Sequence, residues 1–217
     1  MKFLNKQFTQ ETLKLALPVM LTQVGQVSVN LFDNIIVGKL LGAKALAAVS
    51  LGNAMFFSIF IFGLGFSLAI PPLVSEAHSQ HDHNRINSIF RHGFVVNIIL
   101  AFVLMLLIFG IIPLMPYLNQ PKEILPDTIT FLSIVTLSII PFMIFQTMRE
   151  VSEGLSFTIG VTKATIFANV INVILNYVFI EHFKMGVAGS AWATFIARVA
   201  MMVFLYYVLI KEEKTRR

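Results

Sequence analysis

The sequence predicts an all-α integral membrane protein, a bundle of six transmembrane helices. Of its 217 residues, 57% are hydrophobic and 12% are charged, and the mean hydropathy is +0.81. A soluble domain has about 25% charged residues. The apolar residues are gathered into six long stretches without the alternation of barrel strands. Because a spanning helix needs about 20 apolar residues, each stretch is long enough to cross a bilayer.

The six expected helices follow one another along the whole chain. Proline, glycine and charged residues separate them, as expected for helix ends. Their predicted ranges are 14–38, 46–74, 88–112, 125–148, 160–181 and 187–210. Residues 14–210 therefore form the expected membrane domain, and residues 211–217 form a cytoplasmic connector or tail.

Residues 1–13 are amphipathic, with Phe3, Leu4 and Phe8 interspersed among charged residues. A cleavable signal would end its apolar run at a site of small residues, whereas this segment leads into a full span. We expect a surface helix on the inner leaflet.

The distribution of basic residues predicts the orientation, because cytoplasmic loops retain Lys and Arg. An N-terminus inside places eleven basic residues on the cytoplasmic side and four outside, with Arg198 within the membrane. The cytoplasmic set is Lys2, Lys6, Lys14, Arg85, Arg91, Arg149, Lys163, Lys211, Lys214, Arg216 and Arg217, and the outer set is Lys39, Lys44, Lys122 and Lys184. Both termini are therefore expected in the cytoplasm, in a bacterial-type inner membrane.

The sequence argues against several functional classes. The chain has no cysteine, so thiolate metal sites and disulfides are excluded. The net charge of +5 comes without a basic stripe with interleaved aromatics, so no nucleic-acid partner is expected. His78, His81 and His83 have loosely metal-like spacing but fall in a predicted solvated loop. An intramembrane serine protease would need a Ser and His paired inside the bundle, and the five His residues lie in loops or at helix ends. We expect no enzyme and no cofactor.

Three of the predicted helices carry polar stripes, and these indicate where function resides. In the first, Gln26, Asn30 and Asp33 share one face. The fifth and sixth helices carry similar stripes at helical spacing, namely Asn169, Asn172 and Asn176 in the fifth and Ser190, Thr194 and Arg198 in the sixth. Buried polar groups in membrane helices are costly and often functional, although Asn and Thr also act simply as hydrogen-bonding contacts between helices.

Four of these residues are predicted to lie at one depth. Counting from the outer helix ends at 1.5 Å per residue places Asp33, Asn172, Asn176 and Thr194 roughly 7–14 Å below the outer surface. A carboxylate, two amide oxygens and a hydroxyl suit a proton or a small hard cation such as Na⁺. Gln26, Asn30, Asn169 and Arg198 are candidates for the surrounding cavity or network, and Arg198 is a possible counter-ion of Asp33. At the inner end of the fourth helix, Arg149, Glu150 and Glu153 are expected to form a salt-bridged helix end.

At these residues the sequence resembles the multidrug and toxic compound extrusion (MATE) family, the NorM-like cation-coupled exporters. The segments that carry the resemblance are LPVMLTQVGQVSVNLFDNIIVGKLLGAKALAAVSLG (17–52), EGLSFT (153–158), NVINVILNYVFI (169–180) and GVAGSAWAT (186–194). The resemblance implies a cation site at Asp33, Asn172, Asn176 and Thr194. Some members have Asp where this chain has Asn176, which leaves the choice between Na⁺ and H⁺ open.

The resemblance also implies a partner for this chain. Family members have twelve spans in two lobes, and this chain corresponds to the N-terminal lobe, so we expect a fragment or truncated copy whose missing C-terminal six-helix lobe is supplied separately or by a second copy. The expected function is alternating-access antiport of an organic, cationic or drug-like compound against Na⁺ or H⁺ across the lipid bilayer. Two alternatives stay open: a lipid-linked oligosaccharide flippase of the same superfamily, and a structural membrane subunit without transport.

Overall fold

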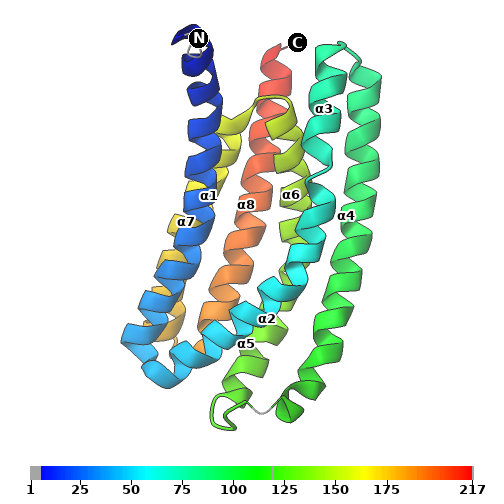
Figure 1. Ribbon diagram of the computed structural model, residues 1–217. Coiled ribbons are helices and arrows are strands. Elements are labelled where there is room, and N and C mark those ends of the chain that lie inside the picture. Colours follow the sequence, from blue (N-terminus) through cyan, green and yellow to red (C-terminus); the bar gives the residue numbers. More distant parts are fainter. Residues whose placement is uncertain (1–5, 119, 217) are drawn as a thin grey trace, which may run out of the picture.

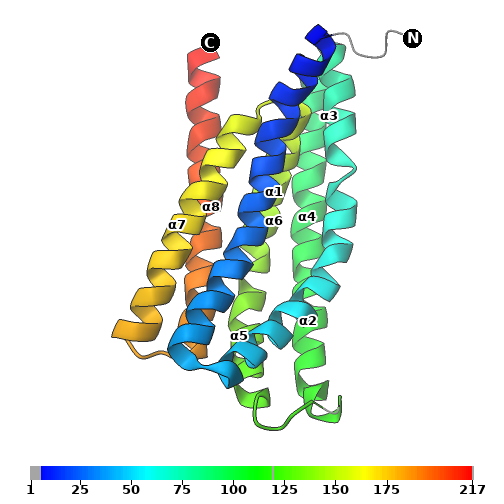
Figure 2. The same ribbon diagram turned by 60° about the vertical axis from the view of Figure 1, so that its left-hand side comes forward.

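The computed structural model describes residues 6–118 and 120–216, with some side chains of the first helix and of the C-terminal end left out of the description. Its chain makes six antiparallel passes (Figures 1 and 2). These are α1 (Lys6–Leu41), α2 (Ala43–Ser67) with α3 (Ile70–Ser79), α4 (His83–Ile111), α5 (Leu125–Leu137) with α6 (Ile139–Gly154), α7 (Thr158–Tyr177) and α8 (Val187–Arg216). A 3₁₀ turn, η1 (Ile112–Tyr117), follows α4, and a π turn, η2 (Val178–His182), follows α7.

The passes confirm the predicted bundle, and two of them are broken where the sequence requires it. Between α2 and α3 the helix is interrupted just before Pro71 and Pro72, which cannot donate a backbone hydrogen bond. Between α5 and α6 the pass bends by 45° at Ser138, three residues before Pro141. The sequence predicted the passes but not these breaks.

Among the described residues, four of the passes are long and apolar enough to cross a membrane, and the bent α5–α6 pair is a fifth if counted as one span. The remaining pass, α1, is 36 residues long and carries Gln, Asn and Asp among its apolar residues. Large apolar side chains also cover the outside of the bundle; Phe62 and Leu106, for example, are 69% and 68% exposed. Such a surface is suited to lipid.

The two ends of the bundle differ from the predicted boundaries in detail. α1 is continuous from Lys6 into the membrane pass, and α8 stays helical to Arg216, so the expected connector at 211–217 is helix over its described residues. The beginning of α1 and the end of α8 lie at the same end of the bundle (Figure 1), as a chain with both termini on one side requires.

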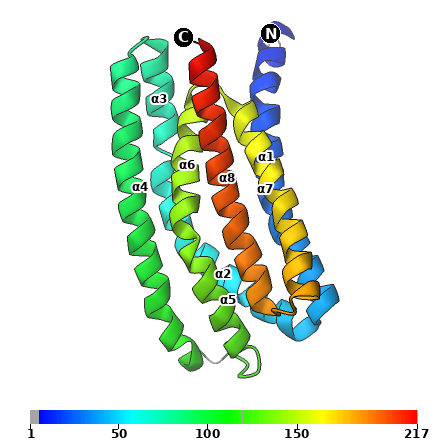
Figure 3. The ribbon, with the colours of Figure 1, turned by 180° about the vertical axis from the view of Figure 1, so that it is seen from behind.

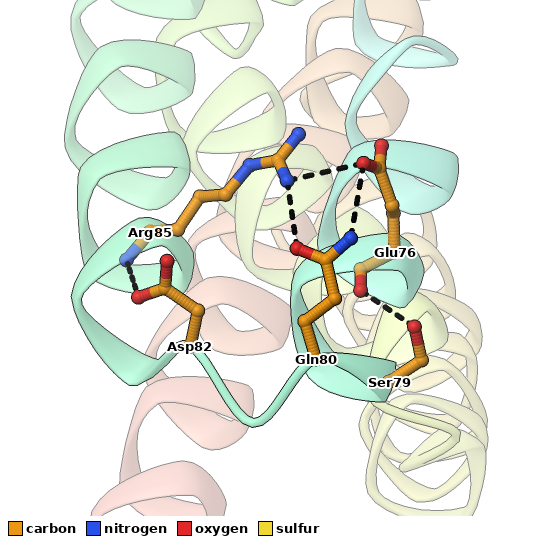
Figure 4. Close-up of polar contacts among 5 residues, drawn as sticks. All are labelled: Glu76, Ser79, Gln80, Asp82 and Arg85. Atoms are coloured by element: carbon orange, nitrogen blue, oxygen red, sulfur yellow. Dashed lines mark hydrogen bonds and ion pairs between the residues drawn. The ribbon is translucent and has the colours of Figure 1, made fainter.

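At that same end, the loop between α3 and α4 is held by local polar contacts (Figure 4). Arg85 donates through Nη1 to Glu76 Oε1 at 3.1 Å and to Gln80 Oε1 at 3.2 Å, and its backbone N–H donates to Asp82 at the start of α4. In the described part of the chain, no group of three His, Cys, Asp or Glu side chains is placed to hold a metal. His78 lies in α3, His83 begins α4 and His81 lies between them, and all three side chains are exposed.

The interior combines apolar packing with a few buried hydrogen bonds between helices. The main cluster, from α2, α4, α5 and α6 with a contribution from α8, includes Phe56, Phe60, Leu104, Phe131 and Met143. A second cluster lies among α6, α7 and α8, and Figure 3 shows α8 between the other two.

A buried chain of side-chain hydrogen bonds also joins α2, α4 and α6. Ser67 donates to Asn97 at 3.1 Å, and Asn97 donates to Thr147 at 2.7 Å. In an apolar interior such bonds fix the relative positions of the helices. These three residues were not singled out by sequence reasoning, although Asn97 is an isolated amide in a long apolar run.

Candidate cation site

The structure brings together the four residues that the sequence places at one depth. Asp33 comes from α1, Asn172 and Asn176 from α7, and Thr194 from α8. All four are buried, with Asp33 2% exposed and Asn176 fully buried. The prediction that these side chains would meet is therefore confirmed.

Hydrogen bonds join the four residues into one network. Asn176 donates through Nδ2 to Asp33 Oδ1 and, at 3.4 Å, to Asn172 Oδ1. Asn172 donates to Thr194 Oγ1 at 3.4 Å, and Thr194 in turn donates to Asp33 Oδ2 at 3.3 Å. Both carboxylate oxygens of Asp33 thus have a partner from another helix, which offsets part of the cost of burying the charge.

One acceptor in this network is left over. The side-chain oxygen of Asn176, Oδ1, is buried and has no hydrogen-bond partner among the described residues. A buried amide oxygen without a donor is costly, so its presence beside a carboxylate is typical of a site that receives a cation. The chemistry is that of hard oxygen ligands: the carboxylate, two amide oxygens and one hydroxyl.

The network borders a cavity inside the bundle. The cavity has a volume of about 400 Å³ and is lined from α1, α2, α6, α7 and α8. Asn172 and Thr194 form part of its wall, as do Asn169 and Arg198. A cation bound at Asp33 would therefore be next to a space large enough for a small organic molecule.

The structure places one further candidate, Asn169, in a supporting position. Asn169 lines the cavity and donates through Nδ2 to the backbone oxygen of Gly25 at 2.7 Å. A β-carbon at Gly25 would lie 3.1 Å from Thr165 Cγ2, so the lack of a side chain there permits this close approach of α1 and α7. The side chains of Gln26 and Asn30 lie outside the described part of the structure.

Arg198 interacts with the charge of Asp33 through space, and its direct contacts are with other residues. Its guanidinium carbon lies 4.7 Å from the ring centroids of both Phe56 and Phe142, and Nη1 donates to Ser138 Oγ at 2.6 Å. Among the described residues it forms no ion pair with Asp33. Cation–π contacts with these two rings stabilise the charge of Arg198, and the hydrogen bond ties α8 to the bend between α5 and α6.

The fold and this buried polar site define the class of the protein: a multi-pass helical membrane protein with a polar centre beside a cavity. A family model described as MatE matches residues 18–178. The chain belongs to the MatE family, whose members are transporters rather than enzymes.

Curated relatives agree with this assignment. The chain is 28% identical to the multidrug resistance protein NorM of Photobacterium profundum, covering 96% of this chain and 46% of that protein. It is 30% identical to a probable multidrug resistance protein NorM of Agrobacterium fabrum, covering 95% and 45%. The chain thus spans somewhat less than half the length of these relatives.

Solved structures show the same fold. A MATE crystal structure in the straight conformation superposes with a TM-score of 0.88 at 16% identity and covers 98% of this chain and 48% of that one. The MATE transporter ClbM in complex with Rb⁺ gives a TM-score of 0.79 at 24% identity, covering 93% and 46%. The six passes therefore correspond to about half of a MATE transporter.

The network around Asp33 can be tested by removing one hydroxyl. Thr194→Val keeps the shape of the side chain but removes both the acceptor for Asn172 and the donor to Asp33. We expect a loss of about 0.5–2 kcal/mol in the free energy of unfolding, because two buried polar groups lose a partner. Unfolding in detergent micelles, followed by the fluorescence of the single tryptophan, measures it.

Thr130→Val is the matched control, because Thr130 is exposed and donates to Pro126 O within its own helix. Equal losses in the two variants would show that the network contributes no more than a surface threonine.

Proposed function

We propose that this chain is the N-terminal lobe of a cation-coupled exporter and that Asp33 binds the coupling cation, Na⁺ or H⁺. The observation that carries the proposal is a buried carboxylate whose partners come from α7 and α8, next to an unpartnered amide oxygen and an internal cavity. The relatives named as multidrug resistance proteins support an organic, drug-like substrate, and a fold neighbour solved with Rb⁺ supports a monovalent cation. The comparisons do not favour the flippase alternative.

The proposed mechanism follows from what holds α1 in place. Asp33 is linked to α7 and α8 through Asn176 and Thr194, and Gly25 is linked to α7 through Asn169. A proton or Na⁺ on the Asp33 carboxylate would compete with the amide and hydroxyl donors for the same oxygens. The packing of α1 against α7 and α8 would then depend on the cation, and the difference in cation affinity between the two packings drives the change in access.

A second six-helix lobe completes the proposed transporter. Alternating access in two-lobed transporters comes from one bundle moving against the other around a central site. The chain covers less than half of its curated relatives, and the complementary lobe, from a separate segment or a second copy, is the partner we propose. The membrane is a bacterial-type inner membrane.

The proposed orientation can be tested by labelling. The chain has no cysteine, so single cysteines report their position without background. We expect His81→Cys, in the loop between α3 and α4, to react with a membrane-impermeant maleimide only after the cells are permeabilised. Lys122→Cys, in the loop before α5, should react in intact cells, because the basic residues place that loop outside. The reverse pattern would contradict the proposed topology.

The role of Asp33 can be tested in the two-lobed transporter reconstituted in liposomes. Asp33→Asn keeps the side-chain shape but removes the charge that binds the cation. We expect efflux of a fluorescent organic cation driven by an imposed Na⁺ or proton gradient to fall at least about tenfold, since a hydrogen-bonded charge contributes more than 1.4 kcal/mol.

Asp127→Asn is the control, because it makes the same change in the first turn of α5, away from the cavity wall. Gradient-driven efflux that survives Asp33→Asn at the rate of the Asp127→Asn control would show that Asp33 does not couple transport to the cation.

A further inference from the structure

A second polar pair lies on the cavity wall, on α6. Gln146 and Glu150 are one helical turn apart, and Gln146 donates through Nε2 to Glu150 Oε1 at 2.6 Å. Both side chains line the cavity and both are buried, with Gln146 3% and Glu150 1% exposed. Sequence reasoning placed Glu150 in a salt-bridged helix end, and the structure corrects that expectation.

The neighbouring charges Arg149 and Glu153 pair with each other, and the Arg149 charge also acts on Glu150 through space. Arg149 donates through Nε to Glu153 at 2.7 Å, which is the predicted salt bridge at this end of α6. Within the described structure, Glu150 Oε1 has only the neutral amide of Gln146, and Glu150 Oε2 and Gln146 Oε1 have no hydrogen-bond partner. Two adjacent acceptors are therefore buried in the cavity wall without a donor.

A ligand that carries positive charge and donates hydrogen bonds would satisfy both oxygens and compensate the carboxylate charge. A buried carboxylate is strongly destabilising unless a cation compensates it. A metal cage is a poor match, because Na⁺ or a divalent ion takes more oxygen ligands than these two. An alkylammonium group, with several N–H donors on one charge, matches both acceptors.

The rest of the cavity wall suits the organic part of such a ligand. Phe57, Phe60, Phe142 and Met201 contribute apolar and aromatic surface, and aromatic faces attract organic cations. Its volume of about 400 Å³ lies within the range of small-molecule sites. Arg198 also lines the cavity near these rings. Its guanidinium already contacts Phe56 and Phe142 and donates to Ser138.

We propose that Glu150 and Gln146 bind the ammonium group of an amphiphilic organic amine at the cytoplasmic end of the cavity. This position is distinct from the Asp33 network, because Glu150 and Gln146 come from α6, which contributes none of the four network residues. The inference rests on the proposed export function for the claim that the amine is cargo. Under this proposal Glu150 binds the substrate and Asp33 binds the coupling cation.

Equilibrium binding to the full chain in detergent micelles tests this assignment without any gradient. Dansylcadaverine, an aromatic fluorophore on a primary ammonium, is the probe, and its N-acetylated form is the neutral analogue. We expect Glu150→Gln to raise the Kd of the ammonium probe about tenfold or more, because a charged hydrogen bond is lost. The Kd of the neutral analogue should stay unchanged.

Glu123→Gln is the matched control, because Glu123 is exposed in the loop before α5. Gln146→Met, similar in size, should also weaken the ammonium probe selectively, which keeps the test decisive if Glu150→Gln folds poorly. An unchanged Kd in both cavity variants, or equal weakening of the charged and neutral probes, would overturn the assignment.

This experiment separates failure of the inference from failure of the proposed function. Asp33→Asn should leave dansylcadaverine binding close to that of the unaltered chain, because Asp33 is not the ammonium ligand. Selective binding through Glu150 combined with gradient-driven efflux that is insensitive to Asp33→Asn would uphold the amine site and reject the coupling role of Asp33. Loss of ammonium binding in Asp33→Asn with none in Glu150→Gln would overturn the division of roles.

Discussion

The structure depends on how a bundle in lipid accommodates the carboxylate of Asp33. In the apolar interior an unpartnered carboxylate is prohibitively costly, so its oxygens need donors from the protein or a cation. Asn176 and Thr194 supply them from α7 and α8. That requirement fixes the register of three helices against one another and sets the depth of the polar centre.

The cavity follows from the same arrangement. α1 reaches α7 closely at Gly25, and α8 is tied to the bend at Ser138 through Arg198. Between these fixed points lies a cavity that borders the Asp33 network at one position and the Glu150–Gln146 pair of α6 at another. Glu150 lies on the cavity wall, whereas Asp33 is linked to the wall through Thr194, which lines the cavity and donates to the Asp33 carboxylate.

Much of this architecture could be predicted from the sequence, because the length and hydropathy of apolar runs identify membrane helices. The six passes follow from apolar runs, and the meeting of Asp33, Asn172, Asn176 and Thr194 follows from helical spacing and depth. The roles of Arg198 and Glu150 could not be predicted. Whether Arg198 pairs with Asp33 or lies between two phenyl rings depends on side chains from α2 and α6, and whether Glu150 is exposed or buried depends on how the inner ends of the helices pack.

The central claim is that Asp33 changes its bonding when a cation binds, and infrared difference spectroscopy of the carboxyl groups measures this most directly. Spectra of the detergent-purified chain are compared before and after adding Na⁺ and before and after lowering the pH, for the unaltered chain and for Asp33→Asn. The account predicts a shift of a carboxylate band with Na⁺, or the appearance of a protonated carboxyl band with acid, that is present in the unaltered chain and missing in Asp33→Asn. Difference spectra that are identical in the two proteins under both conditions would contradict it.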